Sequence, residues 1–447
     1  MKTNDYMNSA CTNSAPMDSI SRPITIFVSA GEPSGDHHGA RLVRAFYSRL
    51  GEDRLRVTGF GGPLMRAVGQ EQLTDLTEFT VFGIVRVLRH LRTFTRLLGE
   101  AEKVFSSPEH RPDAVVVIDY PGFHWELAAR AKRYGIPVFY FISPQIWAWA
   151  PWRVRRMRRL IDHVFCSLPF EEPWLRRHGC AATYVGNPFF DVWNERTQEQ
   201  INTDEDVHTD EDEFMHHSGP IVTILPGSRN QEVSQNTDVF LRAAQRIRES
   251  VPDVRFAVAA FREDQATMIR ERISELNVTE NSGKSSEKTL PIRVFVGRTP
   301  ELIASATACM ACSGSVSLEL LAAHRPTVIH YRIGRIAYRV QKHLRRTRYI
   351  TLVNLLAAEN FESSDRSPYD PDDPKDASVL FPEYLVCRDA SDPIAKHIVH
   401  WLTDRVVYDT LVAKLAVLHA KVVAPAAADH AAAAIIDRIA NKRGLVS

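Results

Sequence analysis

The chain has 447 residues, of which 44% are hydrophobic and 24% charged, and its formal net charge is +1. These values are ordinary for globular proteins and argue against fibrous, disordered and membrane-embedded classes. A single hydrophobic core stops growing at about 250–300 residues, so the length predicts two domains. Residues 1–190 carry a basic excess and residues 191–213 a strong acidic one, which makes the N-terminal half the expected face for anionic partners.

Residues 1–22 read as a polar tail, and no signal peptide is expected because the tail lacks an apolar segment. Residues 23–190 alternate apolar strands with amphipathic helices. The strand candidates are ITIFVSA, RVTGFGG, the start of DAVVVIDYPGF, IPVFYFISP and HVFCSLP. Continuous apolar strands that alternate with helices indicate a parallel sheet covered on both faces.

Residues 191–219 lack an apolar period and predict an acidic, exposed linker. The strand and helix alternation restarts at PIVTILPGSRNQEV and continues through RFAVAAF, IRVFVG, ACMACSGSVSLELL and TVIHY to about residue 385, before the helical residues 386–447. The predicted fold class is therefore α/β, with two Rossmann-like, doubly wound domains at 23–190 and 220–385. Ligands of such domains bind beyond the carboxyl ends of the strands and in the cleft between the domains.

Six cysteines at irregular spacing fit a reducing compartment. Cys309 and Cys312 form a CxxC pair, but it lies in an apolar run without a second pair of ligands, so we predict buried packing rather than redox chemistry or zinc. The uncharged run 137–152 is too short, and too interrupted by prolines, to span a bilayer.

Two loops of the second domain predict a site for a nucleotide diphosphate. In LPGSRNQEV, Gly227 lets the backbone approach an anion, the helix that follows supplies N–H donors, and Arg229 adds a bidentate cation. In CSGSVSLELL, residues 313–315 offer hydroxyl and backbone donors, and Glu319 is placed to bind ribose hydroxyls. Each loop alone could be a simple turn or helix cap, but two in one domain favour the diphosphate.

The first half contributes a second set of candidates. AGEPSGDHHGA matches neither dinucleotide nor P-loop fingerprints, yet its turn directs backbone donors, Glu32, Ser34 and Asp36 toward the cleft. Asp119 ends a buried strand in VVVIDYPGF, a position that suits a general base because the strand fixes it and the cleft desolvates it. A cap of the following helix is the alternative. The acidic runs at 204–206 and 370–373 are predicted to be solvated and to bind no metal.

The ordered set of motifs resembles one family, the bacterial lipid-A-disaccharide synthases. The set is SAGEPSGDHHGA, GFGGPLM, VFGIV, IDYPGF, YFISPQIWAWAPWR, LPFE, YVGNP, LPGSRNQEV, SGSVSLE, NLLA and FPE, over residues 24 to about 385. The resemblance implies an inverting glycosyltransferase of the B-type fold at the inner face of the cytoplasmic membrane. Such enzymes join UDP-2,3-diacylglucosamine to 2,3-diacylglucosamine 1-phosphate, release UDP and form the β-1,6-linked disaccharide of lipid A.

Carried over by motif, Asp119 is implied as the base that takes the proton from the acceptor 6-hydroxyl. No cofactor or metal is implied, because the UDP-sugar is a substrate and helix dipoles with Arg229 offset the charge of the leaving diphosphate. A homodimer is compatible with the sequence. The predicted substrate-binding residues are Gly31, Glu32, Ser34, Gly35, Asp36, Asn187, Gly227, Ser228, Arg229, Glu232, Ser313, Gly314, Ser315, Glu319 and Asn354.

The chain departs from the family pattern at three positions. Arg86 stands where the family usually has Glu, His124 where it has Asn, and Asn187 where it has His. Each lies in a motif expected to border the cleft, which predicts altered acceptor preference or reduced activity. The insert at 361–376, predicted to be a polar loop, also separates NLLA from FPE more widely than usual.

Aromatic and basic segments predict contact with a lipid surface. SPQIWAWAPWR is expected to form an aromatic wall beside the cleft, and the arginines that follow are expected to face anionic lipid. The basic segment 86–98 has the pattern of an interfacial helix, with a soluble helix packed by one face as the alternative. Nucleic acid is not predicted, because no recognised binding module accompanies the arginines.

Two other functions stay open on the sequence. One is a UDP-sugar epimerase with the same two-domain plan that acts on soluble sugars. The other is a non-catalytic UDP-sugar-binding paralogue at the membrane, which the three departures make conceivable.

Overall fold

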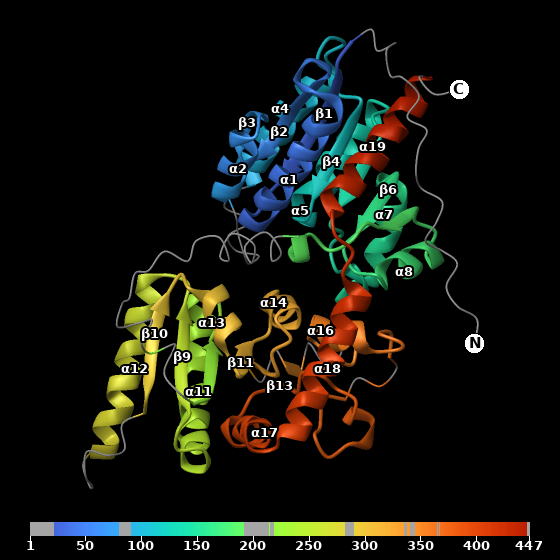
Figure 1. Ribbon diagram of the computed structural model, residues 1–447. Helices are drawn as coiled ribbons and strands as arrows, with labels where there is room; N and C mark the ends of the chain where they lie inside the picture. The colour runs from blue at the N-terminus through green and yellow to red at the C-terminus, as the bar shows by residue number, and fades with distance from the viewer. Residues whose placement is uncertain are drawn as a thin grey trace.

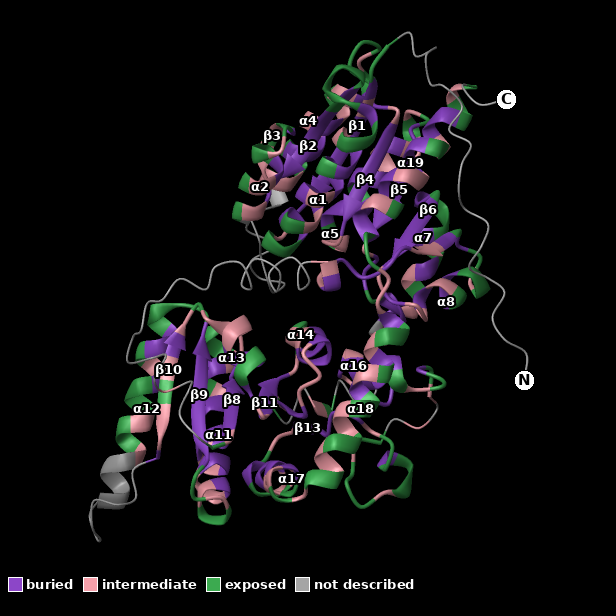
Figure 2. Cartoon of the chain, in the orientation of Figure 1, coloured by how far each residue is buried: buried purple, intermediate pink, exposed green. Residues whose placement is uncertain are grey.

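The computed structural model of the protein describes residues 22–79, 91–191, 214, 219–281, 290–334, 338–339, 345–363, 365 and 367–444. In this part of the chain two α/β domains lie one above the other (Figure 1). The strands are largely buried (Figure 2), because helices cover both faces of each sheet. The predicted fold class is confirmed.

The N-terminal sheet, as far as the structure describes it, has the strand order β3-β2-β1-β4-β5-β6-β7 with all neighbours parallel. Its strands are β1 (Ile24–Ala30), β2 (Leu55–Gly61), β3 (Glu71–Asp75), β4 (Ala114–Ile118), β5 (Val138–Phe141), β6 (His163–Cys166) and β7 (Ala182–Tyr184). Alternate side chains of β4 enter two different apolar clusters, one on each face of the sheet. The strand order reverses between β1 and β4, so a ligand is expected at the loops after these two strands.

Three helices of this domain begin at a proline. Proline opens α1 (Pro33–Leu50), α2 (Pro63–Ala67) and α5 (Pro121–Arg133), because first-turn N–H groups have no partner inside the helix and proline lacks that group. The other elements are η1 (Glu52–Arg54), η2 (Thr77–Phe79), α4 (Leu91–Ser106), α6 (Ile146–Trp149), η3 (Pro151–Arg153), α7 (Val154–Leu160) and α8 (Glu171–Arg177).

The C-terminal sheet repeats the plan with the order β10-β9-β8-β11-β12-β13, again with parallel neighbours among the described strands. Its strands are β8 (Ile221–Leu225), β9 (Arg255–Ala260), β10 (Ile292–Val296), β11 (Ala308–Cys312), β12 (Thr327–Arg332) and β13 (Glu383–Val386). Its helical elements are α11 (Asn230–Ser250), α12 (Glu263–Asn281), α13 (Thr299–Ser305), α14 (Val316–Ala322), α16 (Leu352–Ala357), η5 (Pro374–Asp376), α17 (Ser391–Thr403) and α18 (Arg405–Val422). Here the order reverses between β8 and β11, the strands that precede the two predicted anion loops.

The chain returns to the N-terminal domain at its end. Helix α19 (Ala427–Arg443) packs against α1 (Figure 1) and buries Ile435 and Ile439 in the same cluster as β1. The stretch Arg405–Arg443 is long and apolar enough by composition to cross a membrane. The chain leaves the helical conformation at 423–426, however, and α19 belongs to the core, which argues against one continuous membrane span.

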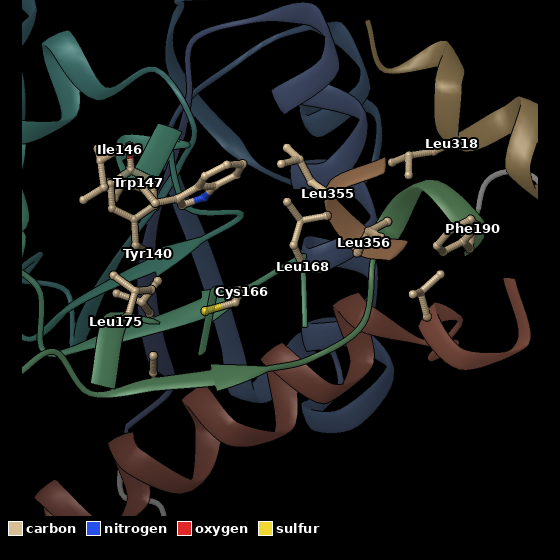
Figure 3. Packing of buried hydrophobic residues seen from close by; sticks show 14 of the residues in the cluster. Tyr140, Ile146, Trp147, Cys166, Leu168, Leu175, Phe190, Leu318, Leu355 and Leu356 are labelled. Atoms are coloured by element: carbon tan, nitrogen blue, oxygen red, sulfur yellow. The ribbon is translucent and has the colours of Figure 1, made fainter. Parts of the chain in front are cut away.

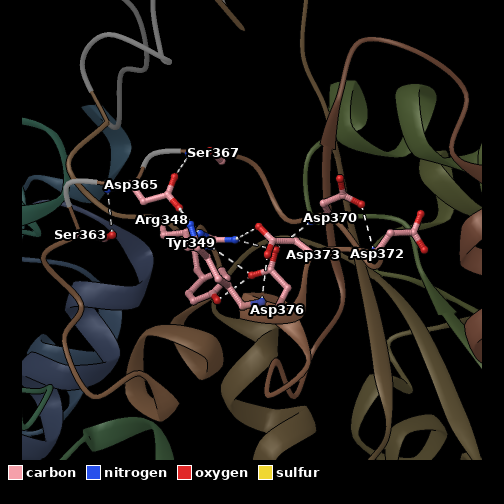
Figure 4. Close-up of polar contacts among 10 residues, drawn as sticks. Arg348, Tyr349, Ser363, Asp365, Ser367, Asp370, Asp372, Asp373 and Asp376 are labelled. Carbon is pink, nitrogen blue, oxygen red and sulfur yellow. Dashed lines mark hydrogen bonds and ion pairs between the residues drawn. The ribbon is translucent and has the colours of Figure 1, made fainter.

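The insert at 361–376 folds around one buried guanidinium (Figure 4). Arg348 is 7% exposed and pairs with Asp365, Asp373 and Asp376, the last through Nε at 3.1 Å and Nη2 at 2.9 Å. Tyr349 donates its hydroxyl to the same Asp376 at 2.8 Å. The expected polar loop is therefore held in place, and part of the acidic run at 370–373 serves this ion pair.

The start of the insert joins the two domains. Phe361 stacks on Phe170 with ring centroids 4.5 Å apart, and Trp147 meets Phe361 edge-on at 5.4 Å. Glu362 accepts a hydrogen bond from Nε1 of Trp174 at 2.9 Å. Figure 3 shows the apolar cluster to which Trp147 belongs, with side chains from both domains.

A buried carboxyl, that of Glu171, supports the Trp147 side chain of this interdomain contact. Glu171 has no exposed surface and accepts hydrogen bonds from Trp147 Nε1 at 2.9 Å and from the N–H of Leu168 at 3.2 Å. Burial raises the pKa of Glu171 from 4.5 to about 7, and these hydrogen bonds only partly oppose the rise. The protonated carboxyl therefore stabilises the fold at low pH, and this stabilisation is lost as the pH rises through about 7.

Replacing Glu171 by glutamine should remove this pH dependence. The free energy of unfolding of Glu171→Gln minus that of the unmodified chain is expected to rise by up to about 3 kcal/mol from about pH 5 to pH 8. One pKa unit corresponds to about 1.4 kcal/mol, and only the unmodified chain has to bury a charge at the higher pH. Urea unfolding at both pH values measures the difference. Glu109→Gln, at an exposed position, controls for the loss of one surface charge, and an equal gain in that variant would contradict the role of burial.

Candidate functional site

A cavity of about 820 Å³ opens at the carboxyl edge of the C-terminal sheet. Its volume lies within the range of small-ligand sites, roughly 300–1,000 Å³. Both predicted anion loops border it, so residues from two distant parts of the chain meet there. The predicted residues that line it are Gly227, Ser228, Arg229, Glu232, Ser313, Gly314, Ser315 and Glu319.

The loop after β8 has the shape of an anion site and already holds a carboxylate. Gly227 has φ 139°, and a Cβ there would lie 2.4 Å from Cβ of Glu232, so only glycine fits without strain. Glu232 accepts the N–H groups of Ser228 at 3.1 Å and Arg229 at 3.2 Å and pairs with the Arg229 guanidinium at 3.0 Å. The donors predicted for phosphate therefore converge on one negative group.

The loop after β11 keeps its hydroxyls near the cavity. Ser315 precedes α14 but makes no capping bond with its side chain, and both Gly314 and Ser315 are exposed. The bond from the Ser317 hydroxyl to the carbonyl of Gly314 at 2.9 Å closes the turn instead. The capping interpretation of Ser315 is thus not supported, and Ser315 lines the cavity.

One wall of the cavity was missed by sequence reasoning. Phe261, directly after β9, lines the cavity and is 67% exposed, and Gly297 with residues 299–301 after β10 completes the wall. Buried Gln265 ties this wall to the anion loop: its Oε1 accepts the N–H of Phe261 at 3.1 Å and its Nε2 donates to the carbonyl of Ser228 at 2.9 Å. The available signal was the position of both segments at the ends of neighbouring parallel strands.

On the N-terminal side, Asp119 directly follows β4 as predicted. Burial raises the pKa of the Asp119 carboxyl, while a hydrogen bond from the N–H of Tyr120 lowers it. Burial also raises the pKa of Glu32, the Asp119 charge adds to this, and Arg229 opposes it. Glu32 therefore lies within electrostatic range of both Asp119 and the anion loop of the other domain. The residue that caps α5 is Tyr120, so Asp119 does not occupy the cap position.

Two predicted ligand-binding side chains have structural roles instead. Asp36 is 2% exposed and accepts the N–H groups of Gly62, Leu64 and Met65 at 2.9–3.0 Å, which fixes the start of α2. Its carboxylate is fully used inside the domain. The substrate contact predicted for Asp36 is therefore not supported.

Asn354 is likewise 2% exposed and does not line the cavity. Its amide donates to the carbonyl of Phe381 at 2.7 Å and to Glu383 at 3.0 Å, and its oxygen accepts the N–H of Phe381 at 3.0 Å. These bonds join α16 to the start of β13 and to Phe381 just before it. The predicted contact of Asn354 with UDP is therefore not supported.

The remaining predicted residues surround the start of α1 or lie near β7. A Cβ at Gly31 would lie 2.3 Å from the ring of Tyr120, so Gly31 permits that ring to sit beside Asp119. Gly35 faces Ala30 at close range, and Ser34 is exposed on the first turn of α1. Asn187 is 7% exposed and its oxygen accepts the N–H of Phe189 at 3.0 Å, a local turn bond.

The aromatic and basic segments differ in part from expectation. Trp147 is 3% exposed and packs between the domains rather than along the cavity, whereas Trp152 is 58% exposed. Helix α7 buries its apolar residues and exposes Arg155 and Arg159.

In the basic segment 86–98, Arg86 and Arg89 lie outside the described residues. Leu98 is buried in the domain core and Phe94 packs 5.8 Å from Phe123. The described part of this segment packs its apolar side chains against the domain core. The interfacial helix over 86–98 stays a prediction, because it rests in part on residues outside the described ones.

The predictions for the CxxC pair and for metal binding can both be compared with the structure. Cys309 and Cys312 are buried, and burial raises the pKa of both thiols to about 12, so the packing role is confirmed. Among the described residues, no group of three or more His, Cys, Asp or Glu side chains could hold a metal ion.

Comparison with known proteins shows the family to which the chain is similar. Residues 26–363 match the family model described as lipid-A-disaccharide synthetase. The lipid-A-disaccharide synthase of Trichlorobacter lovleyi is 33% identical over 76% of this chain and 83% of its own length. That of Myxococcus xanthus is 35% identical over 76% and 82%.

Solved structures show the same fold at low identity. The UDP-GlcNAc 2-epimerase from Neisseria meningitidis bound to UDP-GlcNAc has a TM-score of 0.55 at 12% identity, covering 94% of this chain and 100% of that one. TcCGT1 in complex with UDP has a TM-score of 0.56 at 12% identity, covering 94% and 100%. At this identity the likeness concerns the fold alone.

Replacing Gly227 by alanine is expected to lower the free energy of unfolding of the C-terminal domain by about 1–3 kcal/mol, because alanine must adopt an unfavourable φ and its Cβ meets Glu232. Urea unfolding measures the change. Gly314→Ala is the matched control, since a Cβ at that position has no atom within 4 Å. Equal stability of the two variants would contradict the constraint at Gly227.

Proposed function

The chain belongs to the lipid-A-disaccharide synthetase family, and we propose that it joins UDP-2,3-diacylglucosamine to 2,3-diacylglucosamine 1-phosphate. It is a glycosyltransferase of lipid A disaccharide formation. The observation that carries the specific proposal is the cavity bordered by 227–229 and 313–315, with the desolvated carboxyl of Asp119 in the facing domain. The cavity would hold the donor, and Asp119 would activate the acceptor.

The donor half of the proposal rests on the loop after β8. The N-terminus of α11, a helix of 21 residues, follows Arg229 directly, and helix N-termini favour anions. In our proposal the diphosphate takes the place of the Glu232 carboxylate at the N–H groups of 228 and 229, and Arg229 supplies a bidentate cation. Glu319 and the hydroxyls of Ser313 and Ser315 then surround the rest of the nucleotide.

The reaction itself needs one base and stabilisation of one leaving group. Asp119 takes the proton of the acceptor 6-hydroxyl, and the oxygen attacks C1 of the donor sugar on the face opposite the diphosphate. The bond between C1 and the diphosphate oxygen breaks, and UDP leaves with its electron pair, which inverts the configuration at C1. Burial raises the pKa of Asp119, which makes its carboxylate a stronger base. Arg229 and the helix dipole stabilise the charge on UDP without a metal ion.

Membrane association is part of the same proposal, because both substrates carry acyl chains. Trp152 is 58% exposed, and Arg155 and Arg159 are exposed one turn apart on α7, close by in sequence. An exposed tryptophan beside cations suits the interface of an anionic leaflet. We place this surface on the inner face of the cytoplasmic membrane, where the protein would bind peripherally.

Asp119→Asn tests the assignment of the base. Asparagine cannot accept the proton, so kcat should fall by about 10²–10⁴-fold, while the affinity for UDP, measured by calorimetry, should change little. Mass spectrometry of the product from the two acylated glucosamines reads out disaccharide formation. Asp53→Asn, on the exposed element η1, is the control.

Two results of this assay would contradict the proposal. Donor consumption without disaccharide would favour an epimerase. Equal inactivity of the unmodified chain and Asp119→Asn, with UDP still bound, would favour a non-catalytic paralogue.

The membrane surface is tested by vesicle sedimentation. The triple variant Trp152→Ser, Arg155→Gln, Arg159→Gln should bind vesicles of anionic phospholipid at least about tenfold less, since each cation near such a surface contributes about 1 kcal/mol. The matched control Val417→Ser, Lys414→Gln, Lys421→Gln removes one exposed apolar side chain and two exposed cations from α18. Equal loss in both variants would contradict a specific surface on α7.

A further inference from the structure

Two buried side chains hold the main chain of Asp119. The carbonyl oxygen of Asp119 accepts hydrogen bonds from the Tyr140 hydroxyl at 2.5 Å and from Nδ1 of His124 at 2.6 Å. Tyr140 and His124 have no exposed surface. A carbonyl oxygen has two lone pairs, so both are used by these two donors.

The proton positions in this network follow from the partners. A carbonyl oxygen can only accept, so Nδ1 of His124 carries the proton and Nε2 is the acceptor. Nε2 lies 2.9 Å from the hydroxyl of Ser29, which is also fully buried and therefore donates to it. Burial lowers the pKa of His124 to about 4, so the ring is neutral near pH 7. One neutral imidazole thus links Ser29 to the backbone of Asp119.

The backbone that these bonds hold is strained. Asp119 has φ 49° and Tyr120 has φ 45°, two consecutive non-glycine residues in the left-handed region. Such residues cost about 1–3 kcal/mol each and persist only where the surroundings enforce them. Without the two donors, the peptide between 119 and 120 could rotate, and the Asp119 carboxylate would move with it.

The network also ties three strands together at the edge that carries the site. Ser29 is near the end of β1, Asp119 follows β4, and Tyr140 belongs to β5. These strands are neighbours in the sheet order β1-β4-β5. Tyr140 therefore holds the Asp119 carbonyl from the neighbouring strand β5, and His124 holds it from α5, where Ser29 of β1 fixes the imidazole.

We propose that His124 and Tyr140 are positioning residues that fix the strained backbone of Asp119, so that its carboxylate is held ready for the acceptor hydroxyl. This inference rests on the proposed role of Asp119 as the base. The alternative is that His124 and Tyr140 only satisfy buried polar groups, so that their loss lowers stability without a specific effect on turnover.

A second buried histidine of the same domain provides a matched control. Nε2 of His163 lies 2.9 Å from the hydroxyl of Thr183, as Nε2 of His124 does from Ser29. Burial lowers the pKa of His163 to about 4 as well. His163 is the first residue of β6, at the edge of the sheet opposite Asp119. Its loss therefore removes the bond to Thr183 and the contact of Nδ1 with the Arg438 guanidinium at 3.2 Å, without touching the site.

The experiment compares His124→Leu, Tyr140→Phe, His124→Asn and His163→Leu in the full chain. We expect His124→Leu and Tyr140→Phe to lower kcat by about 10–100-fold, because small displacements of a reacting group cost up to about 10²-fold, while KM for the UDP-sugar changes less than about threefold. Asparagine places an N–H near the position of Nδ1, so His124→Asn should recover most of the kcat. His163→Leu should lose stability in urea yet keep its kcat.

The outcomes separate this inference from the proposed function. Full kcat in His124→Leu and Tyr140→Phe, with Asp119→Asn inactive, would overturn the positioning role and leave the base in place. An active Asp119→Asn would overturn the base itself. An equal fall of kcat in His163→Leu would show a general stability effect and also overturn the inference. If His124→Leu does not fold, Tyr140→Phe, which removes a single oxygen, decides the question.

Discussion

The chemistry of this protein depends on one geometric constraint, that the carboxyl ends of parallel strands meet at the same edge of a sheet. In both sheets the strand order reverses beside the first strand, between β1 and β4 and between β8 and β11. The loops after these four strands carry the glycine-rich turn, Asp119 and the two anion loops. Residues that lie far apart in the chain therefore form one cavity and one facing carboxyl.

Charge balance decides how the loops at this edge are arranged. The N–H donors after β8 converge on the Glu232 carboxylate, so the anion loop is satisfied by the chain itself, and a diphosphate would exchange one anion for another. On the other side, burial raises the pKa of both Glu32 and Asp119, and Arg229 opposes the rise at Glu32. The guanidinium thus links the electrostatics of the two domains.

The facing arrangement of the domains has its own supports. Phe361 and Glu362 bind the aromatic side chains of the N-terminal domain, and their segment is anchored by the buried guanidinium of Arg348. Helix α19 provides a second connection, because it leaves the C-terminal domain and packs on α1. The insert that was predicted to be a polar loop is therefore part of the interdomain contact, and three aspartates pair with one arginine to hold it.

The sequence by itself determined the two parallel sheets, the buried cysteines and the loops that line the cavity, because strand burial and glycine turns are local properties of short segments. Only the tertiary structure decided which polar side chains face a ligand. Asp36 and Asn354 bond to backbone groups that lie 26–29 and 27 residues away, and Trp147 meets Phe361 across the domains. The roles of Phe261 and His124 also depend on contacts that only the folded chain provides. Local spacing shows at which edge of the sheet a side chain lies. Its hydrogen-bond partner, however, belongs to a distant segment, and the two meet only after the chain has folded.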